Sequence, residues 1–269
     1  MSYSDWRIEE DFERTGAHHM ARDEALTRER LENPSLPSLL RLYSWQPAAV
    51  SIGYQQRIES IDLEACQVNE VDVVRRPTGG RAVLHKNEIT YAVITRASPA
   101  DGLYAVHNRI VEALVMSISS LAPFNLEGSP LLVTPRSGGP EKNALPIACF
   151  ASTARHEVTW RGKKVIGSAQ RRFGEVVLQH GSILLTEDHL LLPDLLALSN
   201  DARQKMRDML ERETATLADV FGRPITIQVC AEAIRSNFVT NFLNATKVLA
   251  DREITPSSFI IHNSSLPLG

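Results

Sequence analysis

The stretch that decides the fold is Arg75-Arg76-Pro77-Thr78-Gly79-Gly80-Arg81-Ala82-Val83-Leu84-His85-Lys86-Asn87-Glu88. Apolar runs of strand length flank it, over residues 71–74 and 89–94. We therefore expect two strands joined by a Gly-Gly loop. Adjacent glycines allow positive φ and close approach by another group, because they carry no Cβ. The three arginines indicate a guest with negative charge or several carbonyl acceptors, with an ordinary surface turn as the alternative.

The bulk composition limits the class of protein. With 269 residues, 43% hydrophobic and 23% charged, the chain can bury a sizeable core. A net charge of -3 argues against a dedicated nucleic-acid binder. Cys66, Cys149 and Cys230 are widely spaced, which excludes a disulfide framework and a Cys-x-x-Cys zinc site. The N-terminus is polar and no apolar run is long enough to span a membrane, so we expect a cytoplasmic protein with no bound metal.

Periodicity predicts a mixture of helices and strands. Strands are expected over 39–45 and 49–53, and further strand-like runs are broken at Arg161-Gly162 and Phe173-Gly174. Helices are expected at 17–31, 61–69 and 103–121, and over most of the chain from residue 187. The stretch 122–146 is rich in Pro, Gly and Ser, and a loop of that length is typically functional or mobile. The fold class is α+β: one domain, 1–269, with a mixed, largely antiparallel sheet and a C-terminal helical segment.

A second dense stretch is Gly162-Lys163-Lys164-Val165-Ile166-Gly167-Ser168-Ala169-Gln170-Arg171-Arg172. Strand alternation would put Lys164, Ile166, Ser168 and Gln170 on one face, opposite Val165, Gly167 and Ala169. The small residues would let a ligand or another backbone come close. A phosphate-binding P-loop is excluded, because Gly167 is followed by Ser-Ala rather than Lys-Ser/Thr and the segment has strand character.

Cys149 is the candidate nucleophile. It ends the long loop just before the strands that carry Lys164, and a nearby ammonium group would raise the thiolate fraction of such a cysteine. The alternative, a small buried hydrophobic residue, explains Cys66 and Cys230. His85 and His180 could polarise a carbonyl or move a proton, or could simply bind backbone at strand ends.

Several motifs in order resemble the lipoyl-attachment superfamily, which also includes biotin–protein ligases. The resemblance rests on the 75–85 stretch, on residues 162–170, and on Arg41-Leu42-Tyr43-Ser44-Trp45 and Val50-Ser51-Ile52-Gly53-Tyr54-Gln55. It implies a single biotin/lipoate–protein ligase-like catalytic domain, with a core of about 33–250.

Two details indicate the branch of cysteine-dependent octanoyl-acyl carrier protein:protein N-octanoyltransferases. Arg81 stands where ATP-dependent lipoate–protein ligases usually carry a third glycine, and Cys149-Phe150 matches the cysteine of the octanoyltransferases. Two departures are Lys86, where that family commonly has an acidic residue, and the basic segment 151–156.

The resemblance implies roles for individual residues. Cys149 and Lys164 would be catalytic, without a cofactor. The substrate-binding residues would be Arg75, Arg76, Thr78, Gly79, Gly80, Arg81, His85, Gly167, Ser168, Ala169, Gln170, His180, Gly181 and Ser182. The donor would be octanoyl-acyl carrier protein, and the acceptor a lipoyl-accepting protein such as glycine cleavage H protein, with no nucleic acid or membrane partner. The alternatives are an ATP-dependent lipoate–protein ligase, transfer between two lipoyl-accepting proteins, and a non-catalytic acyl-binding module.

Overall fold

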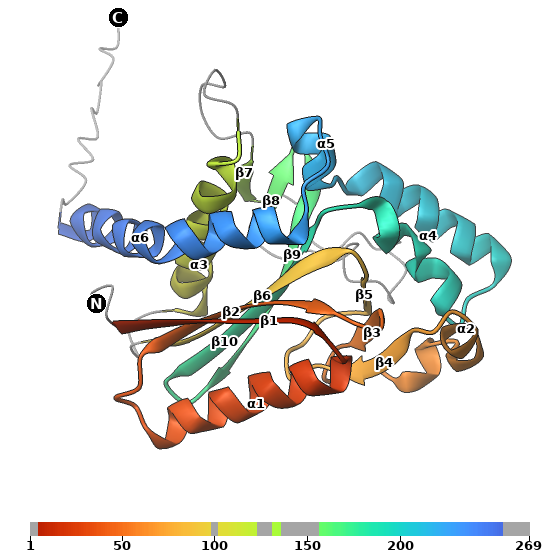
Figure 1. Cartoon of the computed structure of the whole chain (residues 1–269), viewed down its shortest axis with the longest axis horizontal. Coiled ribbons are helices and arrows are strands. Elements are labelled where there is room, and N and C mark those ends of the chain that lie inside the picture. Colours follow the sequence, from red (N-terminus) through yellow and green to blue (C-terminus); the bar gives the residue numbers. More distant parts are fainter. Residues whose placement is uncertain (1–4, 98–101, 123–130, 136–155, 255–269) are drawn as a thin grey trace, which may run out of the picture.

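Two sheets of unequal size organise the chain (Figure 1). The structure is a computed structural model that describes residues 5–97, 102–122, 131–135 and 156–254. The large sheet has the order β1-β2-β6-β10-β9-β8-β7 and the small one β4-β3-β5. The strands are β1 (Trp6–Arg14), β2 (Ser38–Trp45), β3 (Ala49–Ile52), β4 (Asp72–Arg75), β5 (Val83–His85), β6 (Glu88–Arg96), β7 (Leu132–Pro135), β8 (His156–Trp160), β9 (Lys163–Phe173) and β10 (Val176–Leu184). Among the strands of the described residues, only β1–β2 and β3–β4 pair in parallel, so the predicted mixed, largely antiparallel α+β fold is confirmed.

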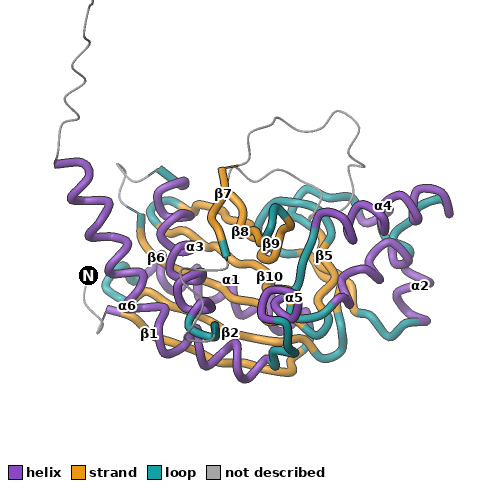
Figure 2. Tube along the Cα trace, turned by 90° about the horizontal axis from the view of Figure 1, so that it is seen from above, coloured by secondary structure: helices purple, strands orange, loops and turns teal. Residues whose placement is uncertain are grey.

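Helices cover both faces of the large sheet. The α-helices are α1 (Gly16–Glu32), α2 (Leu63–Val68), α3 (Leu103–Ser119), α4 (Asn200–Glu213), α5 (Leu217–Phe221) and α6 (Ile227–Ile254), with 3-10 turns η2 (Ile58–Ser60) and η4 (Glu187–Leu195). Helix α1 lies on one face of the sheet, and α3 packs with α6 over the other (Figure 1). Helices α2 and α4 lie together at the end that carries the small sheet (Figure 2). None of the helices in the described ranges is long and apolar enough to span a membrane.

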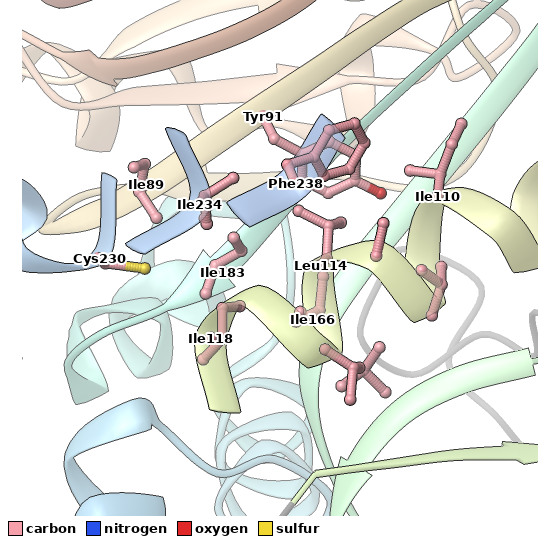
Figure 3. Packing of buried hydrophobic residues seen from close by; sticks show 14 of the residues in the cluster. Ile89, Tyr91, Ile110, Leu114, Ile118, Ile166, Ile183, Cys230, Ile234 and Phe238 are labelled. Carbon is pink, nitrogen blue, oxygen red and sulfur yellow. The ribbon is translucent and has the colours of Figure 1, made fainter. Parts of the chain in front are cut away.

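The main core fills the space between the sheet and the α3–α6 layer (Figure 3). Strand β2 shows how the sequence divides its side chains: Leu40 and Leu42 face this core, whereas Tyr43 and Trp45 belong to the cluster beneath α1. The side chains of β2 therefore alternate between the two faces of the sheet, as the strand expected over 39–45 requires. Cys230 lies fully buried in the main core, where burial raises its pKa to about 12, so it is a packing residue and not a nucleophile.

Strand β1 was not expected from the sequence. The alternation of Trp6, Ile8 and Phe12 is its signal, but charged residues fill most of the positions between them. Trp6 is buried against Phe238 and Phe242 of α6 in edge-to-face contacts, with ring centroids 5.5 and 4.9 Å away. Burial of this ring and parallel pairing with β2 decide the conformation, and both depend on distant segments.

The Gly-Gly stretch connects the two sheets, and this corrects the expected pair of strands joined by a loop. The stretch leaves β4, forms the short strand β5 beside β3, and only then enters β6 of the large sheet. Gly80 has φ of 99°, and a Cβ on Gly53 would lie 2.0 Å from the Gly80 carbonyl oxygen. The close approach that these glycines permit is therefore to the chain's own backbone.

Asp23 of α1 connects the helix to the sheet. Its carboxylate is fully buried and accepts hydrogen bonds from Arg41, from the Tyr43 hydroxyl (3.1 Å) and from His180 Nδ1 (3.3 Å). Burial raises the pKa of Asp23, but the hydrogen bond from His180 and the charge of Arg41 outweigh it, and the net shift is downward. The carboxylate is therefore ionised at neutral pH and neutralises the equally buried Arg41.

His180 carries this network into the Gly-Gly stretch. Its Nε2 atom lies 2.6 Å from the Thr78 hydroxyl, which is itself fully buried. Burial lowers the pKa of His180 below its usual 6.5, so the ring is neutral near pH 7. A neutral ring that donates from Nδ1 to Asp23 must accept the Thr78 proton at Nε2, which assigns the tautomer.

We expect Asp23→Asn to lower the free energy of unfolding by about 3 kcal/mol, because it leaves Arg41 buried with less compensating charge. Urea unfolding followed by circular dichroism measures this. The control is Glu24→Gln, which changes the exposed neighbouring carboxylate and should stay within about 0.5 kcal/mol of the parent. A loss below about 1 kcal/mol for Asp23→Asn would show that the network is not the constraint described here.

We also expect His180 to remain neutral and protonated on Nδ1 at pH 6.5, which long-range ¹H–¹⁵N NMR of the imidazole can detect. Because the folded pKa lies below 6.5, the unfolded chain takes up a proton first as the pH falls. His180 therefore contributes stability above pH 6.5 that is lost as the pH falls toward its folded pKa. A midpoint at or above 6.5, or protonation on Nε2 alone, would contradict this assignment.

Candidate active site

A cleft between the two sheets gathers eight of the predicted substrate-binding residues. These are Arg76, His85, Gly167, Ser168, Ala169, His180, Gly181 and Ser182. The cleft lies on the α1 side of the large sheet, where strands β9 and β10 pair Gly167 with Ser182 and Ala169 with His180. Small side chains on these strands leave room above the sheet. An apolar guest suits such a cleft.

Other lining residues were not expected from the sequence. They are Met20, Tyr43, Trp45, Ser51, Val83 and Thr90. Tyr43 and Trp45 belong to the expected strand 39–45, but only the sheet pairing shows that their face of β2 closes the cleft. Met20 comes from α1, in the helix expected over 17–31. The aromatic and thioether side chains give the cleft its apolar wall.

His85 is fixed at the end of β5 by groups from four other strands, including the Ser182 hydroxyl of β10, which lies 3.3 Å from His85 Nδ1. Its Nε2 atom lies 2.7 Å from the Ser51 hydroxyl, and its Nδ1 atom lies 2.8 Å from Glu88 Oε1. The Trp45 ring stacks on the imidazole, with centroids 4.0 Å apart and an interplanar angle of 13°. Trp45 Nε1 donates to Thr90 (2.8 Å), which in turn donates to Glu88. The ring therefore has one orientation, with its edge toward Ser51 in the cleft wall.

Arg75 and Arg76 bind the protein's own backbone. Arg75 Nη1 donates to the carbonyl oxygens of Gly53, Tyr54 and Gln56, at 2.9, 3.0 and 2.7 Å. Arg76 is buried and donates to the carbonyls of Ser51 (2.9 Å), Gly79 (2.9 Å) and Arg81 (2.7 Å). Both guanidinium groups thus hold the Gly-Gly stretch against β3. Two of the three charges that suggested an anionic guest therefore serve the loop's own conformation.

Gly79, Gly80 and Arg81 lie beside a second, more open hollow. Tyr54, Gln55, Gln56 and Arg171 complete its lining. Arg171 stacks on the Tyr54 ring at 4.3 Å and donates to the Pro77 carbonyl at 3.0 Å. The structure therefore places eight of the predicted substrate-binding residues at the cleft and three at this outer hollow, whereas Arg75, Thr78 and Gln170 line neither.

Ser168 and Gln170 direct their polar groups to the opposite face of the large sheet. The Ser168 hydroxyl lies 2.7 Å from the Tyr91 hydroxyl, and Tyr91 belongs to the core under α3 and α6. Gln170 Nε2 donates to the Leu103 carbonyl at the start of α3 (3.1 Å). These two side chains secure β9 to α3. The predicted face of Ile166, Ser168 and Gln170 is therefore the core face, and the cleft receives Gly167 and Ala169.

Lys164 does not share that face, which corrects the expected alternation. In the β8–β9 ladder Val158 is opposite Ile166, but the next residue, Thr159, is opposite Lys164. One extra residue on β9, Val165, produces this bulge and reverses the alternation before it. Val165 and Ile166 accordingly both pack into the main core. The register assigns Lys164, which is 5% exposed, to the side of Gly167 and Ala169.

Cys149 lies outside the described residues, so its distance from Lys164 stays a prediction. The segment that carries it leads directly into β8, the strand that pairs with the Lys164 region. Cys66, by contrast, is buried under η4, where burial raises the pKa of its thiol. Neither of the two described cysteines has the environment of a nucleophile.

Comparison with known proteins agrees with this arrangement. Residues 15–239 match the family described as "Lipoyl protein ligase A/B catalytic domain". Octanoyltransferase LipM of Moorella thermoacetica is 38% identical over 230 residues, which cover 83% of this chain and 80% of the relative. Octanoyltransferase LipM of Carboxydothermus hydrogenoformans is 32% identical over 259 residues, 93% of each chain.

Among solved structures, the chain is similar to a bipartite lipoate protein ligase of Thermoplasma acidophilum. The TM-score is 0.66 at 21% identity, covering 90% of this chain and 83% of that one. At this identity the likeness concerns the fold, and it places the two sheets in a known architecture. Since the family match spans most of the chain, including the cleft, the small sheet and every strand of the large sheet except β1, this protein belongs to the lipoyl protein ligase A/B catalytic domain family.

Proposed function

We propose that this protein transfers an octanoyl group from acyl carrier protein to a lysine of a lipoyl-accepting protein, in lipoate biosynthesis. The observation that carries the proposal is the 38% identity to octanoyltransferase LipM over 83% of the chain. The cleft supports it, because Tyr43, Trp45 and Met20 offer an apolar wall to an acyl chain.

The proposed reaction has two displacements at one carbonyl carbon. Cys149 Sγ attacks the octanoyl thioester, a new C–S bond forms, and the phosphopantetheine thiolate leaves. The ε-amine of the acceptor lysine then attacks the acyl-enzyme, loses a proton, and expels the Cys149 thiolate. Thioester exchange is nearly balanced in energy, and formation of the amide drives the sequence forward. No nucleotide or cofactor enters either step.

Lys164 is the proposed partner of the thiolate. An ammonium group beside Cys149 favours the ionised thiol and attracts the developing oxyanion. Its position supports the role, because the bulge at Val165 directs it to the cleft side of β9 and it is nearly buried. A charge shielded from water acts more strongly on a neighbouring thiol than an exposed one.

Strand β9 also supports binding of the oxyanion. The ladder between β8 and β9 ends at Ile166, whereas the ladder with β10 continues to Phe173. Along the part of β9 that follows Ile166, every second N–H group points away from β10. We propose that such groups near Gly167 and Ala169 donate to the carbonyl oxygen as its charge develops.

The chain length of the acyl group would be set by the floor of the cleft. Ala169 lies opposite His180 in the β9–β10 register, and both line the cleft. The two hydroxyls of Thr78 and Ser51 are engaged by His180 and His85. The polar atoms of both histidines are therefore satisfied within the protein, which suits a cleft for an apolar chain.

The acylation half-reaction can be tested by intact mass after incubation with octanoyl-acyl carrier protein. We expect one octanoyl adduct, absent in Cys149→Ala and slow to form in Lys164→Met. Hydroxylamine should release the adduct, because it is a thioester. A second arm with free octanoate, ATP and magnesium should give no product. An adduct that persists in Cys149→Ala would contradict the covalent route, and product in the second arm would favour a ligase.

The cleft can be tested by adding bulk at Ala169. We expect Ala169→Leu to lower the ratio of the rate with an octanoyl donor to the rate with a donor three carbons shorter by roughly one to two orders of magnitude. The added side chain would exclude the last carbons of the octanoyl chain, and each methylene that is no longer buried loses about 0.8 kcal/mol. Ala17→Leu makes the same change on the exposed side of α1 and should leave the preference unaltered. An unchanged preference in Ala169→Leu would mean that the acyl chain lies elsewhere.

A further inference from the structure

The corner between β1 and α1 brings together three side chains with metal-ligating atoms. They are Asp11 near the end of β1 and His18 and His19 in the first turns of α1, and one ligand atom from each lies within 4.8 Å of the others. Thr15 forms the corner, because its hydroxyl accepts from the His18 N–H (3.3 Å) and caps the helix. The fold of the corner thus brings one ring nitrogen of each imidazole near the carboxylate.

His19 supplies a second observation that indicates a ligand. Its side chain is fully buried, and Nε2 donates to the Ser44 carbonyl at 2.9 Å. That bond leaves the lone pair on Nδ1, and Nδ1 has no hydrogen-bond partner among the described residues. A buried acceptor without a partner costs free energy, whereas a metal ion would use its lone pair. Since Nε2 is engaged, Nδ1 is the atom available to the cluster.

The charges around the corner limit the class of ion. Asp11 Oδ2 lies 2.6 Å from His18 Nε2 and 3.2 Å from Arg41 Nη2, and Asp11 Oδ1 accepts from Arg14 at 3.3 Å. Two guanidinium groups and the positive end of a helix oppose any cation. Mg²⁺ and Ca²⁺, which depend on several oxygen ligands, would bind weakly there. Zn²⁺ and related ions gain most of their affinity from imidazole nitrogen and tolerate one carboxylate.

We propose that Asp11, His18 and His19 form a Zn²⁺ site with one oxygen and two nitrogen ligands, open to water at the fourth position. From the sequence we expected no bound metal. The proposed site was not foreseen because residues 11 and 18–19 approach each other only when β1 pairs with β2 and α1 folds back. The ion replaces the contact between His18 Nε2 and Asp11. His18 is half-exposed and can admit it.

An ion bound at this corner would affect the cleft through the aromatic side chains that lie between the two sites. The His19 ring packs on Tyr43 with centroids 4.3 Å apart and on Trp45 at 5.1 Å, and both aromatic rings line the cleft. An ion held by His19 would therefore fix the start of α1 against the aromatic wall.

The test uses the full-length chain, stripped of metal with a chelator, in the Cys149→Ala background so that this thiol cannot bind the ion. Zn²⁺ is titrated by calorimetry, and Co²⁺ by visible absorption, which reports the ligand geometry. We expect one equivalent to bind, and affinity to fall at least about 10- to 100-fold in His18→Ala and in Asp11→Asn. Both altered side chains reach the surface, so these variants should fold.

Matched controls separate this site from incidental binding. Glu10→Gln changes an exposed carboxylate on the same strand, and His262→Ala removes an imidazole of the C-terminal segment. Both should bind Zn²⁺ as the parent does. Absence of Zn²⁺ binding in the parent, or unchanged affinity in His18→Ala and Asp11→Asn, would overturn the proposal. Loss of binding in His262→Ala would assign the ion to the tail and would overturn it equally.

Discussion

The buried carboxylate of Asp23 is the constraint on which the rest of the structure depends. It lies on α1, and its hydrogen-bond donors come from β2 and β10, which β6 separates in the sheet. An unpaired charge at this depth would cost several kcal/mol, so the helix can dock in only one position along the sheet. That position brings Met20 into the cleft and fixes the tautomer of His180. Helix placement and ring orientation therefore have one cause.

His180 transmits this constraint to the Gly-Gly stretch through the Thr78 hydroxyl. The stretch is also held from its other side, because Arg75 and Arg76 bind backbone carbonyls around Gly53 and Gly79. Because the Gly-Gly stretch is held on both sides by the protein's own groups, the cleft does not need a charged ligand to keep its shape. This explains how a cleft lined by the Arg76 guanidinium can suit a neutral acyl chain: that group and Arg75 bind the protein's own backbone.

The sequence was sufficient to predict the elements that depend on local or periodic patterns of residues. The amphipathic pattern of 103–121 predicts α3, and the break at Arg161-Gly162 predicts a hairpin, where both residues have positive φ. The resemblance of ordered motifs predicts the fold. Partners far apart in the chain could not be predicted in this way. Strand β1 has too many charged positions for its alternation to stand out, and its neutralising partners, Arg22 and Arg41, lie on other elements. The bulge at Val165 depends on β8, so strand alternation alone placed Lys164 on the wrong face.

That bulge bears on the chemistry as well as on the fold. Without it, Lys164 would follow Ile166 into the apolar core, where an ammonium group would be neutralised or would destabilise the packing. With it, Val165 and Ile166 fill the core together and the lysine turns toward the cleft side of the sheet. The same strand then offers small residues at 167 and 169 for an acyl group. The proposed nucleophile, Cys149, lies outside the described residues, and its place beside this lysine is part of the proposal. An ammonium group and small residues on one strand would give the proposed thioester exchange both a positive charge and room for the acyl chain.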